Sequence, residues 1–391
     1  MMDPYAIHNQ AVARLWNDYH NGRNEWVPIT LAFDEQFLLP LWGCTFRRYY
    51  EDVETQIDVQ LKSQEWIRTR VLQDAEMGLP DAWSVTPAGW MSENEFLGAE
   101  IVRQEDDYAW GQPIPLSKSN LLRGLQRINA RNRIQECTLW RQYLAMKDRT
   151  RDMEFRGRPV RTQMPVASTH GVFTKAAEIR GLDGICTDLF EDPAFVKELL
   201  ETITGLFLAR IAGWHDLAGV EREFPSDAAW GLADDSVAML SRDQYEEFVL
   251  PCHERFYSRM TTGARSIHLC GHAQHLFPTL HARLGVTIFN GPGPQIDLVR
   301  MIDEIDAPIE IQAEVAHATL QRSHAEIEAE IRALLPEKVK QEAKLMLIGY
   351  APRATPLENI GFFYGCGKRY GRVSRHSEGR GNPREVGRSF G

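Results

Sequence analysis

Short apolar segments alternate with longer amphipathic segments along the second half of the chain. The apolar segments centre near residues 232, 267, 288, 311 and 347, and two of them, IEIQAEV and KLMLIGY, have the aliphatic and β-branched character of strands. The amphipathic segments carry apolar residues at helical spacing, and N-cap signals open them at Asp192, Ser241, Asp297, Ser323 and Thr355. Strands that alternate with helices predict parallel βαβ units, either in a (β/α)₈ barrel or in an open sheet.

The first half of the chain is less regular. The pattern predicts a first strand within WVPITLAF, a helix over residues 49–70, a hairpin or loop excursion over residues 96–111, and helix over residues 121–146. The last 25 residues contain seven Lys or Arg and six Gly, a composition that cannot build a packed core. We therefore expect one folded unit over residues 1–366, with helical decoration near its N-terminus, and a loose basic tail over residues 367–391.

Composition narrows the class of protein. The chain has 391 residues, of which 43% are hydrophobic and 25% are charged, and its formal net charge is −10. An acidic chain does not predict a nucleic-acid partner, and a chain without a run of about 18 apolar residues predicts no membrane span. The N-terminal residues lack the basic and apolar pattern of a signal peptide. The six cysteines lie far apart, which suits a reducing compartment, so the expected location is the cytoplasm.

Polar residues follow the predicted strands, at the edge where α/β proteins place their active groups. They are Asp234, Asp235, His268, Cys270, Asn290, Glu314 and Tyr350. His268 and Cys270 are two residues apart on a strand and so point to the same face. An imidazole beside a thiolate is half of a zinc site. The alternative is that Cys270 is a small buried residue and that His268 is a polar strand end or an acid/base group without metal.

Several blocks of the sequence resemble the uroporphyrinogen decarboxylase superfamily. The segment HLCGHAQHLFPTLHARLGVTIFN resembles the His-x-Cys-Gly block of that superfamily. The segments GVFTKAAEIRGLDGICTDLFEDPAFVKELLETIT, DDSVAMLSRDQYEEFVLP and TPLENI resemble other blocks in the same order, and the resemblance runs from about residue 25 to residue 365. It implies a single (β/α)₈ (TIM) barrel with its pocket at the C-terminal ends of the strands.

The resemblance favours the methylcobamide:coenzyme M methyltransferase-like branch. Decarboxylases of the family carry arginine after the first strand, whereas LAFDEQFLLPLWG contains neither Arg nor Lys. In the methyltransferase branch a His-x-Cys pair and a later Cys hold zinc, and a partner protein presents a methyl-corrinoid. His268 and Cys270 match the pair, but Gly349 stands where the later Cys is expected. Cys366 is the nearest other thiol, and Glu314 or His272 could supply a further ligand.

The resemblance also assigns roles. Asp81, in GLPDAW, aligns with a family position after the second strand whose Asp faces the pocket. The catalytic candidates are therefore Asp81, Asp235 and His268, and the substrate-binding candidates are His170, Asn290, Glu314 and Tyr350. The expected function is corrinoid-linked methyl transfer or demethylation on a small molecule. The alternatives are a metal-independent decarboxylase that uses Asp81, and a homologue that binds a ligand without turnover.

Overall fold

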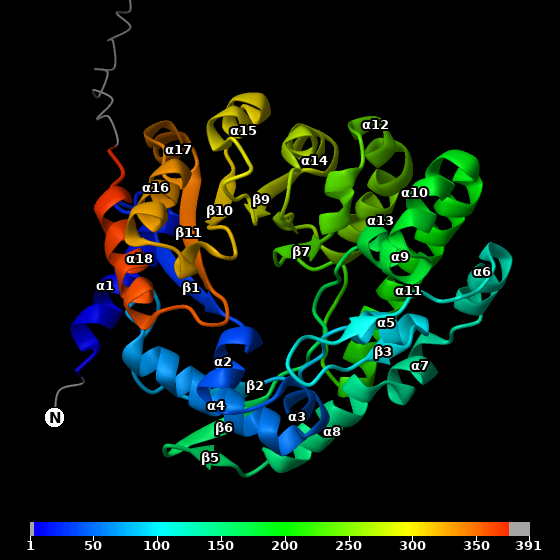
Figure 1. Ribbon diagram of the computed structural model, residues 1–391, viewed down its shortest axis with the longest axis horizontal. Coiled ribbons are helices and arrows are strands. Elements are labelled where there is room, and N and C mark those ends of the chain that lie inside the picture. The colour runs from blue at the N-terminus through cyan, green and yellow to red at the C-terminus, as the bar shows by residue number, and fades with distance from the viewer. Residues whose placement is uncertain (1–3, 375–391) are drawn as a thin grey trace, which may run out of the picture.

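The computed structural model describes residues 4–374 and contains a six-stranded sheet and a three-stranded sheet, in which eight of the strands form parallel pairs (Figure 1). Six strands form one sheet in the order β1-β11-β10-β9-β8-β7, and every pair in it is parallel. β2 pairs with β6 in a second parallel ladder, to which the short strand β5 (Glu154–Phe155) adds an antiparallel edge. The eight parallel strands are β1 (Ile29–Phe33), β2 (Trp83–Val85), β6 (Arg158–Thr162), β7 (Trp230–Ala233), β8 (Arg265–His268), β9 (Val286–Asn290), β10 (Glu310–Glu314) and β11 (Lys344–Ala351).

The two sheets face each other across one cavity. The segments that follow β2 and β6 line this cavity together with the strands β7 to β10. Within residues 4–374, no strand ladder joins β1 to β2 or β6 to β7. The arrangement is therefore a ring of eight strands with two interrupted seams. Side chains satisfy the free edge of β1, and an extended backbone segment covers the edge of β7.

Asp74 and Gln73 satisfy the free edge of β1. The carboxylate of Asp74 accepts a hydrogen bond from the backbone N–H of Ile29 at 2.7 Å, and Oε1 of Gln73 accepts one from the N–H of Leu31 at 2.8 Å. Asp74 also pairs with Lys368 and accepts from the hydroxyl of Tyr364. Buried backbone donors must be paired, so these side chains replace the missing strand neighbour.

The seam beside β7 is covered by the extended segment after β6. The carbonyl of Thr169 accepts from the N–H of Ala233 at 3.1 Å, and the carbonyl of Ala167 accepts from the indole of Trp230 at 2.9 Å. Ser168 donates to the carbonyl of Gly231. This contact holds the segment that carries His170 against the strand that leads to Asp235.

The helices of the second half lie outside the strands, where some cover the outer face of the six-stranded sheet and others, such as α10 and α11, pack mainly on neighbouring helices (Figure 1). Phe277 of α14 packs on Phe289 of β9 with ring centroids 5.4 Å apart, which shows how the two layers meet. These helices are α9 (Val172–Arg180), α10 (Leu182–Glu191), α11 (Pro193–Ala218), α12 (Arg242–Gln244), α13 (Leu250–Met260), α14 (Phe277–Leu284), α15 (Leu298–Ile305), α16 (His324–Leu334), α17 (Glu337–Glu342) and α18 (Leu357–Tyr370). A π-helical turn (Tyr245–Val249) joins α12 to α13, and 3₁₀ turns span Asp235–Met239, Gln274–Leu276 and Thr319–Gln321.

Four of the five helix-capping predictions are confirmed. Ser241 and Ser323 form complete capping boxes, and the carboxylates of Asp192 and Asp297 accept from backbone N–H groups of the first turn. The prediction for Thr355 is wrong. Its hydroxyl donates to the carbonyl of Pro352, and the last helix begins at Leu357.

The N-terminal half supplies the expected helical decoration. Its helices are α1 (Ala6–His20), α2 (Glu35–Leu41), α3 (Phe46–Glu51), α4 (Val53–Arg70), α5 (Ser92–Leu97), α6 (Lys118–Gln126), α7 (Ala130–Glu136) and α8 (Thr138–Arg149). The predicted helix over residues 49–70 is divided at Asp52, whose carboxylate caps α4. The excursion contains a short hairpin of β3 (Ile101–Val102) and β4 (Trp110–Gly111). The stretch over residues 121–146 is divided into three helices, with one break at Cys137.

Helix α18 continues through the boundary that we expected at residue 366. It ends at Tyr370, and the backbone then bridges to Trp26 through Arg372. Residues 375–391 of the expected tail lie outside the described residues. No helix among residues 4–374 combines the length and the apolar character needed to cross a bilayer.

Candidate metal centre and its cavity

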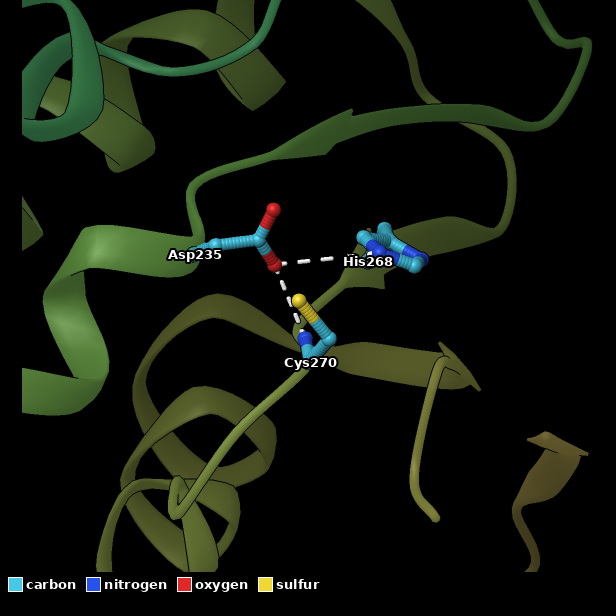
Figure 2. A group of neighbouring side chains, drawn as sticks. All are labelled: Asp235, His268 and Cys270. Atoms are coloured by element: carbon cyan, nitrogen blue, oxygen red, sulfur yellow. Dashed lines mark hydrogen bonds and ion pairs between the residues drawn. The ribbon is translucent and has the colours of Figure 1, made fainter. Parts of the chain in front are cut away.

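Three side chains with metal-binding atoms converge at the ends of β7 and β8 (Figure 2). Asp235 follows β7, His268 ends β8, and Cys270 comes two residues later. One donor atom from each lies within 4.8 Å of the other two. The register explains this meeting, because Ala233 of β7 is paired with His268 of β8. The sequence predicts the His–Cys half of this group, and the structure adds Asp235 as the third member.

Asp235 holds the other two residues in place. Its Oδ1 accepts a hydrogen bond from the backbone N–H of Cys270 at 2.8 Å and lies 3.7 Å from Nε2 of His268. The opposite ring nitrogen of His268, Nδ1, bonds to Oδ1 of Asn290. When Nδ1 carries the only ring proton, the lone pair of Nε2 faces the negatively charged Oδ1 of Asp235 with no hydrogen between them. A cation bound between the two atoms would remove this repulsion.

The Cys270 thiol is hard to ionise in the metal-free protein. Partial desolvation of the sulfur, together with the charge and hydrogen bond of Asp235, raises its pKa to about 12. A divalent cation among the three groups would reverse this preference, because a coordinated thiol is deprotonated.

The donor set fits zinc. Nitrogen, sulfur and carboxylate oxygen are the three ligand types that zinc takes, and a catalytic zinc commonly has three protein ligands and one open position. Tetrahedral zinc with bonds of about 2.0 to 2.3 Å places its donor atoms roughly 3.3 to 3.8 Å apart. Small side-chain shifts bring the present group into that range. Cys270 is exposed, and Asp235 and His268 are half-buried, so the site is open to the cavity.

The neighbouring carboxylate, Asp234, has a different task. It is fully buried and accepts hydrogen bonds from the backbone N–H groups of Phe173 and Thr174 at the start of α9 and from His253. Gly171 makes this approach possible, because a Cβ at that residue would lie 2.3 Å from Cγ of Asp234. Asp234 therefore fixes α9 to the end of β7, and Asp235 is left to face the cavity.

The cavity beside this group has a volume of about 980 Å³. His268, Asp235, Asn290 and Gln312 line its strand side, and the segments that follow β2 and β6 line the opposite side. Pockets for small molecules commonly measure about 300 to 1,000 Å³, so this cavity is at the upper end of that range.

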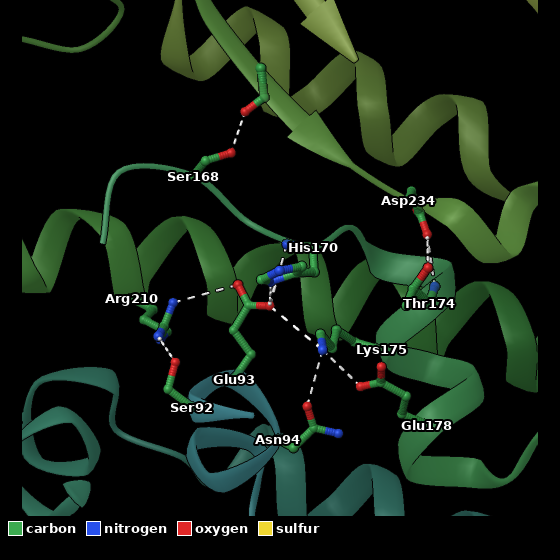
Figure 3. Close-up of polar contacts among 11 residues, drawn as sticks. Ser92, Glu93, Asn94, Ser168, His170, Thr174, Lys175, Glu178, Arg210 and Asp234 are labelled. Carbon is green, nitrogen blue, oxygen red and sulfur yellow. Dashed lines mark hydrogen bonds and ion pairs between the residues drawn. The ribbon is translucent and has the colours of Figure 1, made fainter. Parts of the chain in front are cut away.

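A second polar group, buried around Glu93, lies in the cavity wall (Figure 3). Glu93 Oε2 accepts from Nδ1 of His170 at 3.1 Å and lies 3.9 Å from Nζ of Lys175, and Nη1 of Arg210 lies 3.5 Å from Oε1. Lys175 also pairs with Glu178 at 2.8 Å. Burial alone would raise the pKa of Glu93, but the hydrogen bond from His170 and the charges of Arg210 and Lys175 hold it at about 2. Two anions thus balance two cations.

The remaining predicted residues are placed as follows. His170 lines the cavity with 65% of its side chain exposed, and Asn290 lines it beside His268. Glu314 ends β10 close to His268 and Asp235, and burial is the main cause of its raised pKa. Tyr350 ends β11, where its hydroxyl donates to Asp34 at 2.7 Å and its ring packs on His317.

The structure contradicts the placement of Asp81. This residue is exposed and precedes β2, which begins at Trp83, so it lies at the end of the strand opposite to the cavity. The prediction assumed that the second strand ended before Asp81. The residues that follow β2 and do reach the cavity include Thr86 and Glu93.

Apart from His170, the members of the Glu93 group were not predicted, because they are scattered along the chain. A signal existed at Arg210, which interrupts the apolar run ITGLFLARIAGW, and at Lys175 within FTKAAEI. A lone charge in an apolar run indicates a buried partner, because an unpaired buried charge is too costly. The pattern does not say where that partner is.

Comparison with known proteins identifies the family. A family model described as uroporphyrinogen decarboxylase (URO-D) matches residues 160–370, which is more than half of the chain. The chain belongs to the uroporphyrinogen decarboxylase family. This confirms the family resemblance and the (β/α)₈ barrel architecture that it implied. A search of curated proteins found no match.

Two solved structures resemble this URO-D family member. A structure of a methyltransferase from Methanosarcina mazei has a TM-score of 0.61 and 15% sequence identity, and the match covers 92% of this chain and 98% of that one. This likeness shows a shared fold. A B12-independent methionine synthase from Shewanella sp. W3-18-1, solved in complex with selenomethionine, has a TM-score of 0.41 and 12% identity over 82% of this chain and 87% of that one.

The position of Gly349 in this URO-D protein explains why β11 supplies no ligand there. A Cβ at Gly349 would lie 2.6 Å from the ring of Phe363 on α18 and 2.9 Å from Leu31. The residue therefore faces the helix layer and not the cavity. Cys366 is buried on α18, and His272 is exposed outside the three clustered donors.

Proposed function

We propose that this URO-D family protein is a zinc-dependent methyltransferase that transfers a methyl group between a corrinoid and a small thiol. The observation that carries the proposal is the convergence of Asp235, His268 and Cys270 at the edge of the cavity. The shared fold with a methyltransferase supports the proposal and does not by itself establish the reaction.

The residues present can hold zinc in a neutral centre. Cys270 as thiolate and Asp235 as carboxylate would each contribute one negative charge, and His268 would bind through Nε2 as a neutral ligand. When bound there, zinc supplies a Lewis acid that lowers the pKa of a coordinated substrate thiol. The three protein ligands would balance the charge of a divalent cation. A substrate thiolate bound beside them would therefore give the centre only one net negative charge.

The cavity provides the space for the second substrate. In the proposed reaction the thiol proton is released, a sulfur lone pair forms the new carbon–sulfur bond, and the bond between the methyl carbon and its donor breaks with its electron pair left on the donor. We propose that the donor is a methyl-corrinoid presented by a partner protein at the open side of the cavity. The reverse direction corresponds to the demethylation of a methylated substrate.

The Glu93 group would bind the distal end of the substrate. The segment that carries His170, β7 and β8 lie side by side, so His170 and His268 are about two strand spacings, roughly 10 Å, apart. With Nδ1 donating to Glu93, His170 offers Nε2 to the cavity as an acceptor. A small thiol that carries a hydrogen-bond donor at its other end fits this spacing.

The carboxy-lyase alternative has weaker support. It relied on Asp81 as the acid, and Asp81 lies outside the cavity. A homologue that binds a ligand without turnover would share the cavity, so turnover decides between that alternative and an enzyme.

Metal analysis tests the proposal first. The purified protein should contain about one zinc ion per chain, and Asp235→Ala, His268→Ala and Cys270→Ala should each lose most of it. Cys186→Ala, which removes a half-buried thiol on α10, is the matched control and should keep its zinc. Zinc that is absent from the native protein, or equally retained by the three variants, contradicts the proposal.

A transfer assay tests the reaction. Methylcobalamin is offered together with a panel of small thiols, and loss of the methyl–cobalt absorbance is followed with formation of the thioether. The native protein should accelerate transfer to at least one thiol, and His268→Ala should not. No acceleration with any thiol, by a protein that is loaded with zinc, refutes the methyltransferase assignment.

A further inference from the structure

We propose that Gln312 and Asn290 are positioning residues that fix His268 in the tautomer whose Nε2 is free to bind a metal. The inference deepens the proposed function, because it concerns the histidine of the proposed zinc centre. It rests on a continuous chain of side-chain hydrogen bonds that crosses three adjacent strands, from Glu310 on β10 to His268 on β8.

The chain begins at a carboxylate. Oε1 of Glu310 accepts from Nε2 of Gln312 at 2.8 Å, and Oε1 of Gln312 accepts from Nδ2 of Asn290 at 3.1 Å. Oδ1 of Asn290 then bonds to Nδ1 of His268. The strand register supports these contacts, because Asn290 is paired with Gln312 on one side and with His268 on the other.

The direction of every bond follows from its first member. A carboxylate accepts and does not donate, so Gln312 must present its NH₂ group to Glu310 and its oxygen to Asn290. Asn290 must then present its NH₂ group to Gln312 and its oxygen to His268. The last acceptor requires Nδ1 of His268 to carry a proton, so in the neutral ring Nε2 has the lone pair.

This lone pair points to the candidate metal position. Nε2 of His268 lies 3.7 Å from Oδ1 of Asp235, on the side where the sulfur of Cys270 also lies (Figure 2). The opposite tautomer would direct an N–H at that position and would have to change before a metal could bind. Histidine ligands of metals commonly donate their other nitrogen to a carboxylate or carbonyl oxygen, and loss of that partner costs about 10- to 100-fold in affinity.

The first test measures zinc affinity by competition with a chromophoric chelator. Asn290→Leu removes the acceptor with little change in volume and should weaken zinc binding about 10-fold or more. Asn290→Asp keeps an acceptor for Nδ1 and should bind zinc at least as tightly as the native protein. Thr287→Val, an isosteric change three residues before Asn290 on β9, is the control and should bind zinc as the native protein does.

The comparison separates positioning from packing. If Asn290 served only to fill space, its replacement by Leu or by Asp would affect zinc binding equally little, because both side chains are similar in shape to Asn. Gln312→Met tests the distal part of the chain, because it removes the acceptor that Gln312 offers to the NH₂ group of Asn290 without touching His268. It should weaken zinc binding in the same direction as Asn290→Leu. Equal zinc affinity for the native protein and Asn290→Leu overturns the proposal, and an unchanged Gln312→Met removes Gln312 from it.

A second measurement does not depend on zinc. Nitrogen-15 chemical shifts of the His268 ring, recorded in metal-free protein at the high-pH end of a titration, report which nitrogen carries the proton, and His268→Gln assigns the signal. The native protein should show Nδ1–H, and Asn290→Leu should show a mixture or Nε2–H. If the native protein shows Nδ1–H and binds no zinc, the relay stands and the zinc proposal fails. If the native ring shows Nε2–H, the relay is refuted whatever the metal content.

Discussion

Replacement of Glu93 by glutamine should destabilise the protein at neutral pH and much less in acid. The pKa of Glu93 is lowered from an ordinary 4.5 to about 2 in the folded protein. One pKa unit corresponds to about 1.4 kcal/mol, so the carboxylate contributes about 3 kcal/mol to folding when it is ionised. Glu93→Gln keeps an acceptor for His170 but leaves Arg210 and Lys175 without their shared anion, and broken buried pairs cost a similar 3 to 5 kcal/mol.

The sign of the pH dependence follows from the lowered pKa. A carboxylate with a depressed folded pKa stabilises fully above its unfolded pKa of 4.5, and this contribution is lost as the pH falls toward 2. Urea unfolding of both proteins, at a series of pH values between 7 and 3, gives the free energy of unfolding. The difference between native protein and Glu93→Gln should be about 3 kcal/mol at pH 7 and should shrink steadily below pH 4.5.

The comparison removes the effect of titrating groups that do not contact Glu93, because these groups act on both proteins alike. A difference that stays constant from pH 7 to pH 3 would refute the linkage argument. A difference near zero at pH 7 would show that Arg210 and Lys175 find other partners, and the reasoning from the buried group would fail. Glu178→Gln, which changes the half-buried second anion of the group, should cost less than Glu93→Gln.

Three further changes test other parts of the structure by urea unfolding. Gly171→Ala should cost about 2 to 4 kcal/mol, because the residue has a φ of +79° and its Cβ would overlap Asp234; a cost below 1 kcal/mol would contradict this packing. Asp74→Asn should cost about 2 to 3 kcal/mol, because it weakens charged hydrogen bonds at the free edge of β1, and a neutral result would mean that this seam is not held by the carboxylate. His170→Ala should cost only about 1 kcal/mol, because one hydrogen bond is lost and Arg210 remains beside Glu93; a loss as large as that of Glu93→Gln would refute this ranking.

The strands that could be predicted are those with a strong local pattern. The segments near residues 232, 267, 288, 311 and 347 all became strands of the six-stranded sheet, since each is a short apolar segment with an amphipathic helix on either side. β2 was not predicted because it has only three residues, and β6 was not predicted because its exposed residues are polar, as in RPVRT. Their place in the ring depends on contacts with α4 and α8 that no local pattern encodes.

The error at Asp81 has the same origin. Without a visible second strand, GLPDAW could be read as the segment after it, whereas the strand begins two residues after Asp81.

The strand register also decided the role of Asp235. Asp235 and His268 are 33 residues apart in the sequence, and only the pairing of β7 with β8 places them around one point. His268 and Cys270 were predictable as a pair because their spacing of two residues needs no tertiary information, although β8 ends at His268 and Cys270 lies beyond it.

Asp235, the third donor, follows β7, and its position determines which strand ends remain available to bind substrate. With Asp235, His268 and Cys270 all at the ends of two adjacent strands, β9 to β11 supply no member of the donor cluster. Asn290 and Glu314 are then polar neighbours of the donor cluster and not members of it. Tyr350 lies further along the sheet, where its hydroxyl donates to Asp34. Gly349 could not reverse this arrangement by mutation to cysteine, because its side chain would point into Phe363. Gly349→Cys should therefore destabilise the protein without raising its zinc affinity, and tighter zinc binding in that variant would show that β11 turns its other face to the site.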